Sequence, residues 1–322
     1  GGTECHLGPF LSTRQMRSLL WWGCLPGLSQ AQVYTQKENM GLQDGRHDTF
    51  PCVLEPRLTT WEDAPLFKIN HEPYTNTKKV LVRKGEVPPF TQVSVATFLE
   101  GGYFEDHDHD DMFELFYVLK GTGRFAITER NATSTKWSRK EFAAEPGLLL
   151  HLPPGVQHAG LTDMGFEFLM IGVATKQEAC SKPAIIGVVP SEEECHATTE
   201  FKQLQVRAGV ALQKHQQLLA AGELPDVLGV TLVTLDAGES LGVADVSAET
   251  GKLPSTQVFF VLDGTGTTHS ARLEGDLAPS SLLLLPQELD SRISAGTDGL
   301  KMLRFIVHLT DPRCQPRLHS EL

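Results

Sequence analysis

No cluster of basic residues and no long apolar run occurs anywhere in the sequence. The 28 lysines and arginines are outnumbered by 40 aspartates and glutamates, and the formal net charge is −12. Nucleic acids and anionic membrane surfaces are negatively charged, so this balance argues against both as partners. A membrane-spanning helix needs about 20 consecutive apolar residues, and we therefore expect no membrane span.

Cysteine is also sparse, and the six residues of this type include no pair at CxxC spacing. A zinc knuckle and a dithiol redox site are both built on such pairs, so neither is expected. The cysteines are expected either as buried small apolar residues or, in an oxidising compartment, as partners in disulfides.

The sequence does contain many short apolar segments separated by glycine and proline, a pattern typical of an all-β fold. The strands expected in the first half are Lys79–Arg83, Gln92–Leu99, Tyr103–Phe104, Phe113–Leu119, Gly123–Thr128, Leu148–Leu152 and Phe166–Ala174. One helix is expected over Phe201–Ala221, where apolar residues recur and Gly222 supplies a stop. A chain of 322 residues has room for two domains of ordinary size.

The stretch Gly101–Gly121, GGYFEDHDHDDMFELFYVLKG, concentrates metal-ligating residues between two expected strands. Side chains alternate along an extended chain, so His107 and His109 share one face while Asp108 points away. A bend after His109 lets the next strand run back and bring Glu114 to the same side. Two imidazoles and a carboxylate suit a divalent transition metal.

A fourth candidate ligand, His158, ends the segment GLLLHLPPGVQH, which is interpreted as an apolar strand followed by a Pro-Pro-Gly turn. Together the two segments fit the pattern Gly-x5-His-x-His-x4-Glu-x6-Gly, followed by Gly-x5-Pro-x-Gly-x2-His. This pair of motifs resembles the cupin family over about Thr91–Thr175. Cupins often have an asparagine four residues after the last histidine, where this chain has Thr162, but that position is not a ligand.

The cupin resemblance implies a small jelly-roll β-barrel that holds a metal inside through these four ligands. Mn or Fe suits the site best, and Ni and Zn stay as alternatives because the ligand set does not separate them. The competing interpretation is a solvated acidic loop beside a core histidine. Flanking aspartates are expected to form a solvated rim that favours cations and disfavours anionic ligands. They are Asp106, Asp108, Asp110 and Asp111.

The second half of the chain repeats the first, which predicts a two-barrel cupin, or bicupin. The run FFVLDGTG, ending at Gly266, mirrors FYVLKGTG, ending at Gly123, and the strand before Pro286 mirrors the strand before Pro153. The ligands are missing from the second copy, so the second barrel is expected to bind no metal. The corresponding positions hold Thr250, Lys252 and Gln257, or Ala244 and Val246 by a second count, and Ser291 replaces the last histidine.

The fold class predicted is therefore all-β, with two tandem cupin barrels of jelly-roll type and a short helical connection. The lead-in segment is expected to pack on the barrel exterior through Trp61 and Phe67. The expected parts are a signal peptide or other extension at 1–31, the lead-in segment at 32–65, a metal-binding barrel at 66–178, a linker with the helix at 179–222, a degenerate barrel without metal at 223–312, and a tail at 313–322.

Strand parity also suggests residues near the metal. If the strand runs unbroken into His107, Tyr103 faces inward and is a candidate general acid or base, or a hydrogen-bond donor to substrate. The alternative for Tyr103 is an aromatic residue at the barrel mouth. His151 is a second catalytic candidate from its own strand, but between leucines it is equally interpretable as a core histidine.

Pocket walls follow from the same alternation. Phe116 and Val118 share the parity of Glu114 and would form an apolar wall. Lys120 and Arg124 are candidates for contacting a substrate carboxylate, with plain solvent exposure as the alternative.

The N-terminal region and a surface triplet bear on the compartment. The run from Met16, MRSLLWWGCLPGLSQA, has the layout of a secretory signal peptide cleaved before Gln32, although an amphipathic or disordered extension is the alternative. Asn131-Ala132-Thr133 is an N-glycosylation acceptor in an expected loop. The cysteines that remain after cleavage are even in number: Cys52, Cys180, Cys195 and Cys314. We expect a secreted or ER-lumenal protein, with a cytoplasmic one as the alternative.

The cupin resemblance leaves three functions open, because the fold hosts many reactions. The first is a metal-dependent oxidoreductase of dioxygenase type acting on a small-molecule substrate. The second is a metal-dependent lyase, isomerase or hydrolase, and the third is a non-catalytic binding, storage or extracellular structural protein. A homo-oligomer is compatible with all three.

Overall fold

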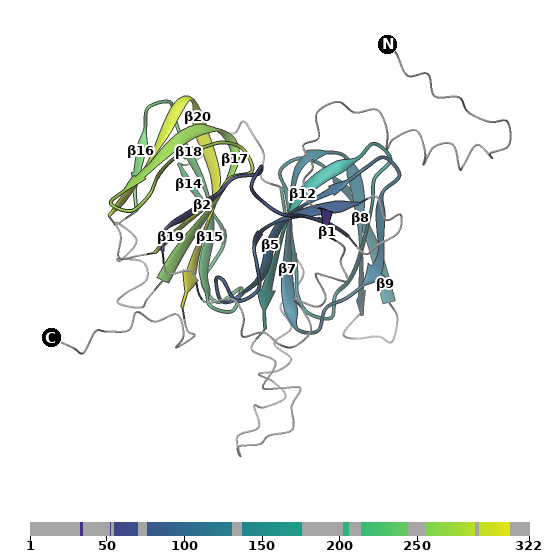
Figure 1. The fold of residues 1–322 in the computed structure, drawn as a ribbon. Coiled ribbons are helices and arrows are strands. Elements are labelled where there is room, and N and C mark those ends of the chain that lie inside the picture. The colour runs from purple at the N-terminus through teal and green to yellow at the C-terminus, as the bar shows by residue number, and fades with distance from the viewer. Residues whose placement is uncertain are drawn as a thin grey trace, which may run out of the picture. The chain divides into compact units, whose positions relative to one another are not determined.

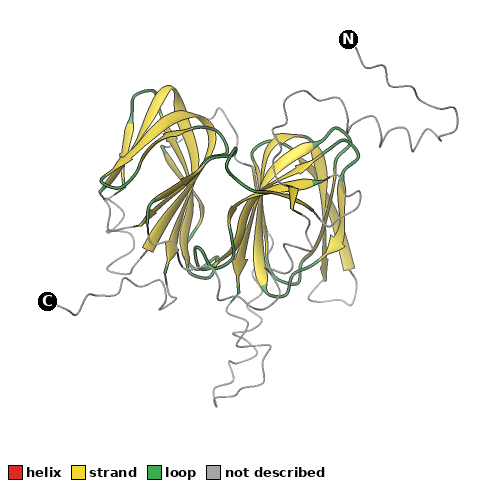
Figure 2. Cartoon of the chain, in the orientation of Figure 1, coloured by secondary structure: helices red, strands yellow, loops and turns green. Residues whose placement is uncertain are grey.

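The structure is a computed structural model that describes residues 33–34, 52, 55–69, 76–130, 137–175, 202–205, 214–243, 255–286 and 290–309. Every regular element within these ranges is a β-strand, as Figure 2 shows. The all-β prediction is therefore confirmed. The part of the chain that the structure describes contains no helix that could span a membrane.

The predicted helix over 201–221 is wrong wherever the structure describes this segment. Lys202–Gln205 forms strand β13, and His215–Leu219 forms strand β14. Each strand hydrogen-bonds to the edge of a sheet, β13 to β10 and β14 to β15. Pairing with an existing edge satisfies the backbone groups of short segments and overrides their intrinsic helix propensity.

The first barrel is built from two antiparallel-rich sheets, drawn in purple to teal in Figure 1. The larger sheet has the order β1-β3-β4-β5-β12-β7-β10-β13, and the smaller sheet has the order β6-β11-β8-β9. The bounds are β1 Val33–Tyr34, β3 Leu66–Lys68, β4 Thr77–Val82, β5 Phe90–Phe98, β6 Tyr103–His107, β7 Met112–Gly121, β8 Gly123–Arg130, β9 Trp137–Ala144, β10 Leu148–Leu152, β11 Gln157–Leu161 and β12 Phe166–Ala174.

Alternation along these strands separates two apolar cores. In β10, Leu148, Leu150 and Leu152 belong to the core inside the first barrel, whereas Leu149 belongs to a different core on the opposite face of the sheet. Because β10 is buried along its whole length, its sequence is continuously apolar and does not alternate with polar residues. The inner core of the first barrel is rich in phenylalanine and surrounds the candidate site: Phe98, Phe104, Phe116, Phe125, Phe166 and Phe168.

The second barrel repeats the strand order of the first. The series β4-β5-β12-β7-β10 in the first barrel corresponds to β14-β15-β20-β17-β19 in the second. The additional bounds are β15 Val227–Leu235, β16 Ser240–Gly242, β17 Ser255–Ser270, β18 Glu274–Leu277, β19 Leu282–Pro286 and β20 Ser291–His308. The internal sequence repeat thus corresponds to a repeated topology.

The lead-in segment contributes a strand to the second barrel. Strand β2, Arg57–Thr59, pairs antiparallel with β19 and lies among the green and yellow strands in Figure 1. The Arg57 guanidinium, in contrast, donates hydrogen bonds to Glu86 and to the carbonyl of Leu81, which belong to the first half of the chain. This segment was expected to pack on the exterior of a barrel, and part of it instead extends a sheet.

The remainder of the lead-in packs as its aromatic residues predict. Trp61 is partly buried against the apolar core that includes Leu149. The Lys79 ammonium lies 4.6 Å from the centre of the Trp61 ring. Phe67 in β3 is 5% exposed.

Several sequence-based predictions fall outside the described residues. These include the proposed cleavage site at Gln32, the acceptor Asn131, and the second-barrel positions 244, 246, 250 and 252. Cys52 is disulfide-bonded, and the other five cysteines lie outside the described ranges.

Candidate metal centre

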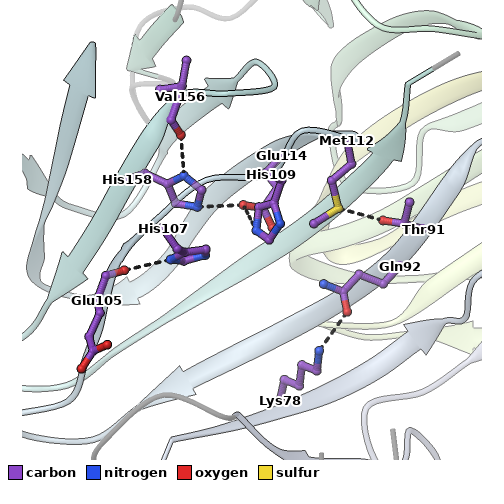
Figure 3. Close-up of polar contacts among 10 residues, drawn as sticks. All are labelled: Lys78, Thr91, Gln92, Glu105, His107, His109, Met112, Glu114, Val156 and His158. Atoms are coloured by element: carbon purple, nitrogen blue, oxygen red, sulfur yellow. Dashed lines mark hydrogen bonds and ion pairs between the residues drawn. The ribbon is translucent and has the colours of Figure 1, made fainter. Parts of the chain in front are cut away.

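The four predicted ligands converge at one end of the first barrel. The donor atoms of His107, His109, Glu114 and His158 all lie within 4.8 Å of one another, and Figure 3 shows the imidazoles and the carboxylate directed at one another. His107 ends β6, Glu114 lies in β7, and His158 lies in β11. Three strands from both sheets therefore build the cluster.

A β-bulge orients the β6 side of the cluster. His158 pairs with His107, and Gly160 pairs with Phe104. The two pairs are two residues apart along β11 but three residues apart along β6, so β6 contains one extra residue. The extra residue reverses the alternation, and Phe104 is buried while Glu105 is exposed. The condition for Tyr103 to face inward, an unbroken strand into His107, is therefore not met.

Glu114 is the centre of the cluster. Its Oε2 lies 2.9 Å from Nε2 of His158 and 3.4 Å from Nε2 of His109. The ring of His107 is 4.4 Å from the ring of His158, measured between centroids. Glu114 is 4% exposed and His158 is 2% exposed, so these two groups are removed from water.

Backbone carbonyls fix the tautomers of two imidazoles. Nδ1 of His107 lies 2.8 Å from the carbonyl oxygen of Glu105, and Nδ1 of His158 lies 3.0 Å from that of Val156. A carbonyl oxygen only accepts hydrogen bonds, so each Nδ1 must carry a hydrogen and donate the hydrogen bond. The Nε2 lone pair of each neutral ring is then left for a metal, and the carbonyl holds the ring in orientation.

The buried polar atoms of the site fit a cation. Glu114 Oε2 and His158 Nε2 are buried and receive no ordinary hydrogen bond, although they lie 2.9 Å apart. With His158 neutral, both atoms present lone pairs to each other, which is unfavourable unless a proton or a metal ion lies between them. Three imidazole nitrogens and one carboxylate match the ligand preferences of divalent transition metals.

Without a metal, the pKa values describe a proton shared in this pair. Burial alone would lower the pKa of His158, but the adjacent Glu114 carboxylate raises it overall. Burial alone would raise the pKa of Glu114, but hydrogen bonding to His158 and the charges of the imidazoles lower it. Desolvation, followed by repulsion from His158, lowers the pKa of His107.

A pocket of about 410 Å³ opens beside the ligands. Its apolar wall includes Phe116, as strand parity predicts, together with three further phenylalanines, Phe98, Phe104 and Phe168. Its polar lining includes Lys78 and Gln92, which are joined by a 3.0 Å hydrogen bond from Nζ to Oε1. The site thus combines a ligand cluster, an apolar wall and a single buried lysine.

The two residues proposed for catalysis lie elsewhere. Tyr103 lines a separate, shallow hollow on the β6-β11-β8-β9 sheet, together with Arg124 and Arg139. The ring of His151 stacks on Phe113 with centroids 5.6 Å apart, on the face of β10 that carries Leu149. Neither side chain lines the pocket beside the four ligands.

The two cations considered as candidates for a substrate carboxylate, with solvent exposure as the alternative, form ion pairs with the protein. Lys120 lies 3.0 Å from Glu167, and Arg124 lies 4.0 Å from Glu141. The pocket lysine, Lys78, was missed because the predicted strand began at Lys79, whereas β4 begins at Thr77. Including Thr77 in the strand would have placed Lys78 on the same face as Val80.

The second barrel carries different residues at the ligand positions. Glu114 pairs with Leu152, just before Pro153, and Gln257 pairs with Leu285, just before Pro286. Gln257 accepts a 2.9 Å hydrogen bond from Nε of Arg304 and donates to the Val243 carbonyl. Ser291 pairs with Ser270 as His158 pairs with Ile127. The strand register therefore supports the sequence alignment at Gln257 and Ser291.

Comparisons with known proteins agree with this architecture. The family model for AraC-like ligand binding domains matches residues 99–177. A comparison with curated protein sequences gave no significant match.

Solved structures with a similar fold span both barrels. An 11S globulin from Wrightia tinctoria aligns with a TM-score of 0.53 and 13% identity, covering 80% of this chain and 84% of that one. Procruciferin, an 11S globulin from Brassica napus, gives 0.54 and 10%, covering 80% and 85%. The bacterial pirin YhhW from Escherichia coli, in complex with nickel(II), gives 0.51 and 14%, covering 79% and 99%. The fold of this chain is therefore similar to that of these two-barrel proteins, and its first barrel contains the segment that matches the AraC-like ligand binding domain.

Proposed function

We propose that the first barrel, over residues 66–178, binds one divalent transition metal and that the protein is a metal-dependent enzyme acting on a small organic molecule. The observation that carries the proposal is the convergence of four donor side chains within 4.8 Å of one another, three of which, His107, His109 and Glu114, line a 410 Å³ pocket. A structural metal site closes all its positions with protein ligands, whereas four ligands on a metal that accepts six leave positions open towards the pocket.

The reaction we favour is an oxidation of dioxygenase type. A redox-active metal such as Mn or Fe in this site supplies dioxygen activation, and a Lewis-acidic ion supplies polarisation of a substrate oxygen. His107 and His158 hold their Nε2 atoms in place through their carbonyl partners. The phenylalanine wall excludes water and orients an apolar substrate beside the ligands.

A metal-dependent lyase, isomerase or hydrolase is the second candidate, because the solved pirin with this fold contains nickel(II). Elemental analysis of protein purified without a metal-binding tag, followed by oxygen-uptake assays with phenolics and small acids, separates the two. Iron or manganese together with oxygen consumption supports the dioxygenase-type reaction. Nickel or zinc without oxygen consumption supports the second candidate. A full complement of bound metal without turnover of any tested compound would favour a non-catalytic binding protein.

We also propose that the protein is secreted and that Asn131 carries a glycan. The disulfide at Cys52 supports an oxidising compartment, since disulfides are rare in the cytosol. Mass spectrometry of protein from its native cells tests this. Cleavage near Gln32 with a glycan on Asn131 is the expected result, and an unmodified Asn131 on a chain that retains its N-terminal segment would contradict it.

A further inference from the structure

The pocket beside the candidate metal contains one buried cation that is not a ligand. Lys78 lies in β4, pairs with Ala96 of β5, and is 5% exposed. Its ammonium donates to Oε1 of Gln92, and both residues line the pocket (Figure 3). Burying an ammonium costs free energy unless partners compensate, so a lysine in this place needs more than one neutral amide.

Lys78 has donor capacity available for a ligand. An ammonium group has three N–H donors, and one of them is used by Gln92. Burial, partly opposed by the Glu114 charge, lowers the pKa of Lys78 to about 8. At neutral pH most molecules therefore still carry the positive charge, which makes a charge-assisted hydrogen bond to an anion available.

The charges lining the pocket also favour an anion once a metal is bound. Lys78 and Lys84 balance Asp111 and Glu114 in the lining, so a divalent cation makes the whole pocket net positive. Of the rim aspartates, Asp111 lines this pocket and is counted above, whereas Asp106, Asp108 and Asp110 do not line it. Asp106 is in addition paired with Arg139, whose Nη1 lies 2.7 Å from both carboxylate oxygens.

We propose that the substrate is a small organic acid with an apolar body, and that the Lys78 ammonium binds its carboxylate while the body packs on the phenylalanine wall. The wall beside Lys78 consists of Phe98, Phe104, Phe116 and Phe168. This inference rests on the proposed metal-dependent function for the position of the substrate. It is tested by binding and therefore does not depend on turnover.

Benzoate and benzamide are a suitable pair of probes, because they share a ring and differ in charge. Isothermal titration of metal-loaded and metal-free protein should give benzoate an affinity at least about tenfold higher than benzamide in the wild type. In metal-free protein, Lys78→Met should abolish this preference and leave benzamide binding unchanged, whereas Lys78→Arg should retain it in part. Lys120→Met is the matched control, since it removes a lysine charge whose side chain is 70% exposed and outside the pocket.

Equal affinities for the two probes in the wild type, or a benzoate preference that survives Lys78→Met in metal-free protein, would overturn the inference. The same holds if Lys120→Met removes the preference as completely as Lys78→Met. If Lys78→Met does not fold, Lys78→Gln decides by the same criterion. Metal content measured on each sample separates the two proposals: a wild type without metal sinks the proposed function, while the metal-free titrations still decide the role of Lys78.

Discussion

The 2.9 Å contact between Glu114 and His158 in the candidate site has two stable states. In one, a proton lies between the carboxylate and the imidazole, and in the other a metal ion replaces it. The pKa of His158 is raised because Glu114 outweighs the effect of burial, and the pKa of Glu114 is lowered because the imidazoles outweigh the effect of burial. The metal-free protein should therefore respond to pH through this pair.

Metal-free protein should be most stable between about pH 4.5 and 6.5. The contribution of His158 is fully present below its ordinary pKa of 6.5 and is lost as pH rises through the raised value. The contribution of Glu114 is present above its ordinary pKa of 4.5 and is lost as pH falls through the lowered value. Thermal unfolding midpoints of the wild type, measured at a series of pH values, should decrease as pH rises above 6.5. The midpoints of Glu114→Gln should not show this decrease. Identical pH profiles for both proteins would contradict the shared proton.

Above pH 6.5, metal affinity should increase with pH, whereas the stability of the metal-free protein decreases. Because the metal must displace the proton from His158, apparent affinity should rise by up to about tenfold per pH unit until that proton is gone. Titrations in buffers of different ionisation enthalpy measure the number of protons released. If metal binding released no proton at pH 6, the Glu114–His158 pair would not hold a shared proton at that pH.

At the scale of single elements, strand β11 contains the ligand His158 and, by pairing with β6, holds it opposite the ligand His107. Gly160 lies opposite Phe104, next to the bulge that brings His107 against His158. A Cβ atom at Gly160 would lie 2.2 Å from the Phe104 ring, so the backbone can approach this closely only with glycine. Phe104 in turn packs on the rings of His107 and His158.

Gly160→Ala should therefore destabilise the protein by about 1–3 kcal/mol through overpacking. It should also weaken metal binding, because the displaced Phe104 ring contacts two ligands. Gly229→Ala in β15 is the matched control, since the nearest atom to its new Cβ lies at 3.7 Å. Urea denaturation and metal titration measure both effects. Equal stabilities of the two variants would refute the role assigned to the close approach.

The sequence predicts the parts of this element that depend on local spacing. The cupin motifs identify all four residues of the cluster, and period-two alternation identifies most strands and the wall residue Phe116. The bulge in β6 depends on pairing with β11, which no local pattern reveals, and this is why Tyr103 was expected to face inward. Strand β13 was missed for the same reason, since the sheet edge that stabilises it, β10, is distant in sequence. Strand β14 pairs instead with the next strand along the chain, β15.

At the scale of the whole molecule, one apolar core contains residues of both barrels. It includes Val93 and Ile171 from the first and Leu232 and Phe305 from the second. The rings of Phe90 and Phe305 meet edge to face with centroids 5.9 Å apart. The second barrel can thus stabilise the barrel that carries the candidate site.

Phe305→Ala should lower the free energy of unfolding by about 3–5 kcal/mol, because the side chain is 2% exposed and packs in the shared core. Both barrels should still unfold in one transition, since they share that core. Phe259→Ala, in a core formed with other second-barrel residues, is the comparison. Circular dichroism and metal release followed during heating provide independent signals. Two separate transitions in the wild type would mean that the barrels are energetically independent.

The most direct test of the proposed metal centre is metal content measured by mass spectrometry on the wild type and on five single variants. We expect one metal ion per wild-type chain, held by the first barrel. Alanine at His107, His109, Glu114 or His158 should each weaken metal binding by more than about 100-fold, because loss of a ligand costs more than loss of a supporting contact. Alanine at Asp108, which lies between two ligands in sequence, should leave occupancy unchanged. A full site in the four ligand variants, or one emptied by Asp108→Ala, would contradict the proposed centre.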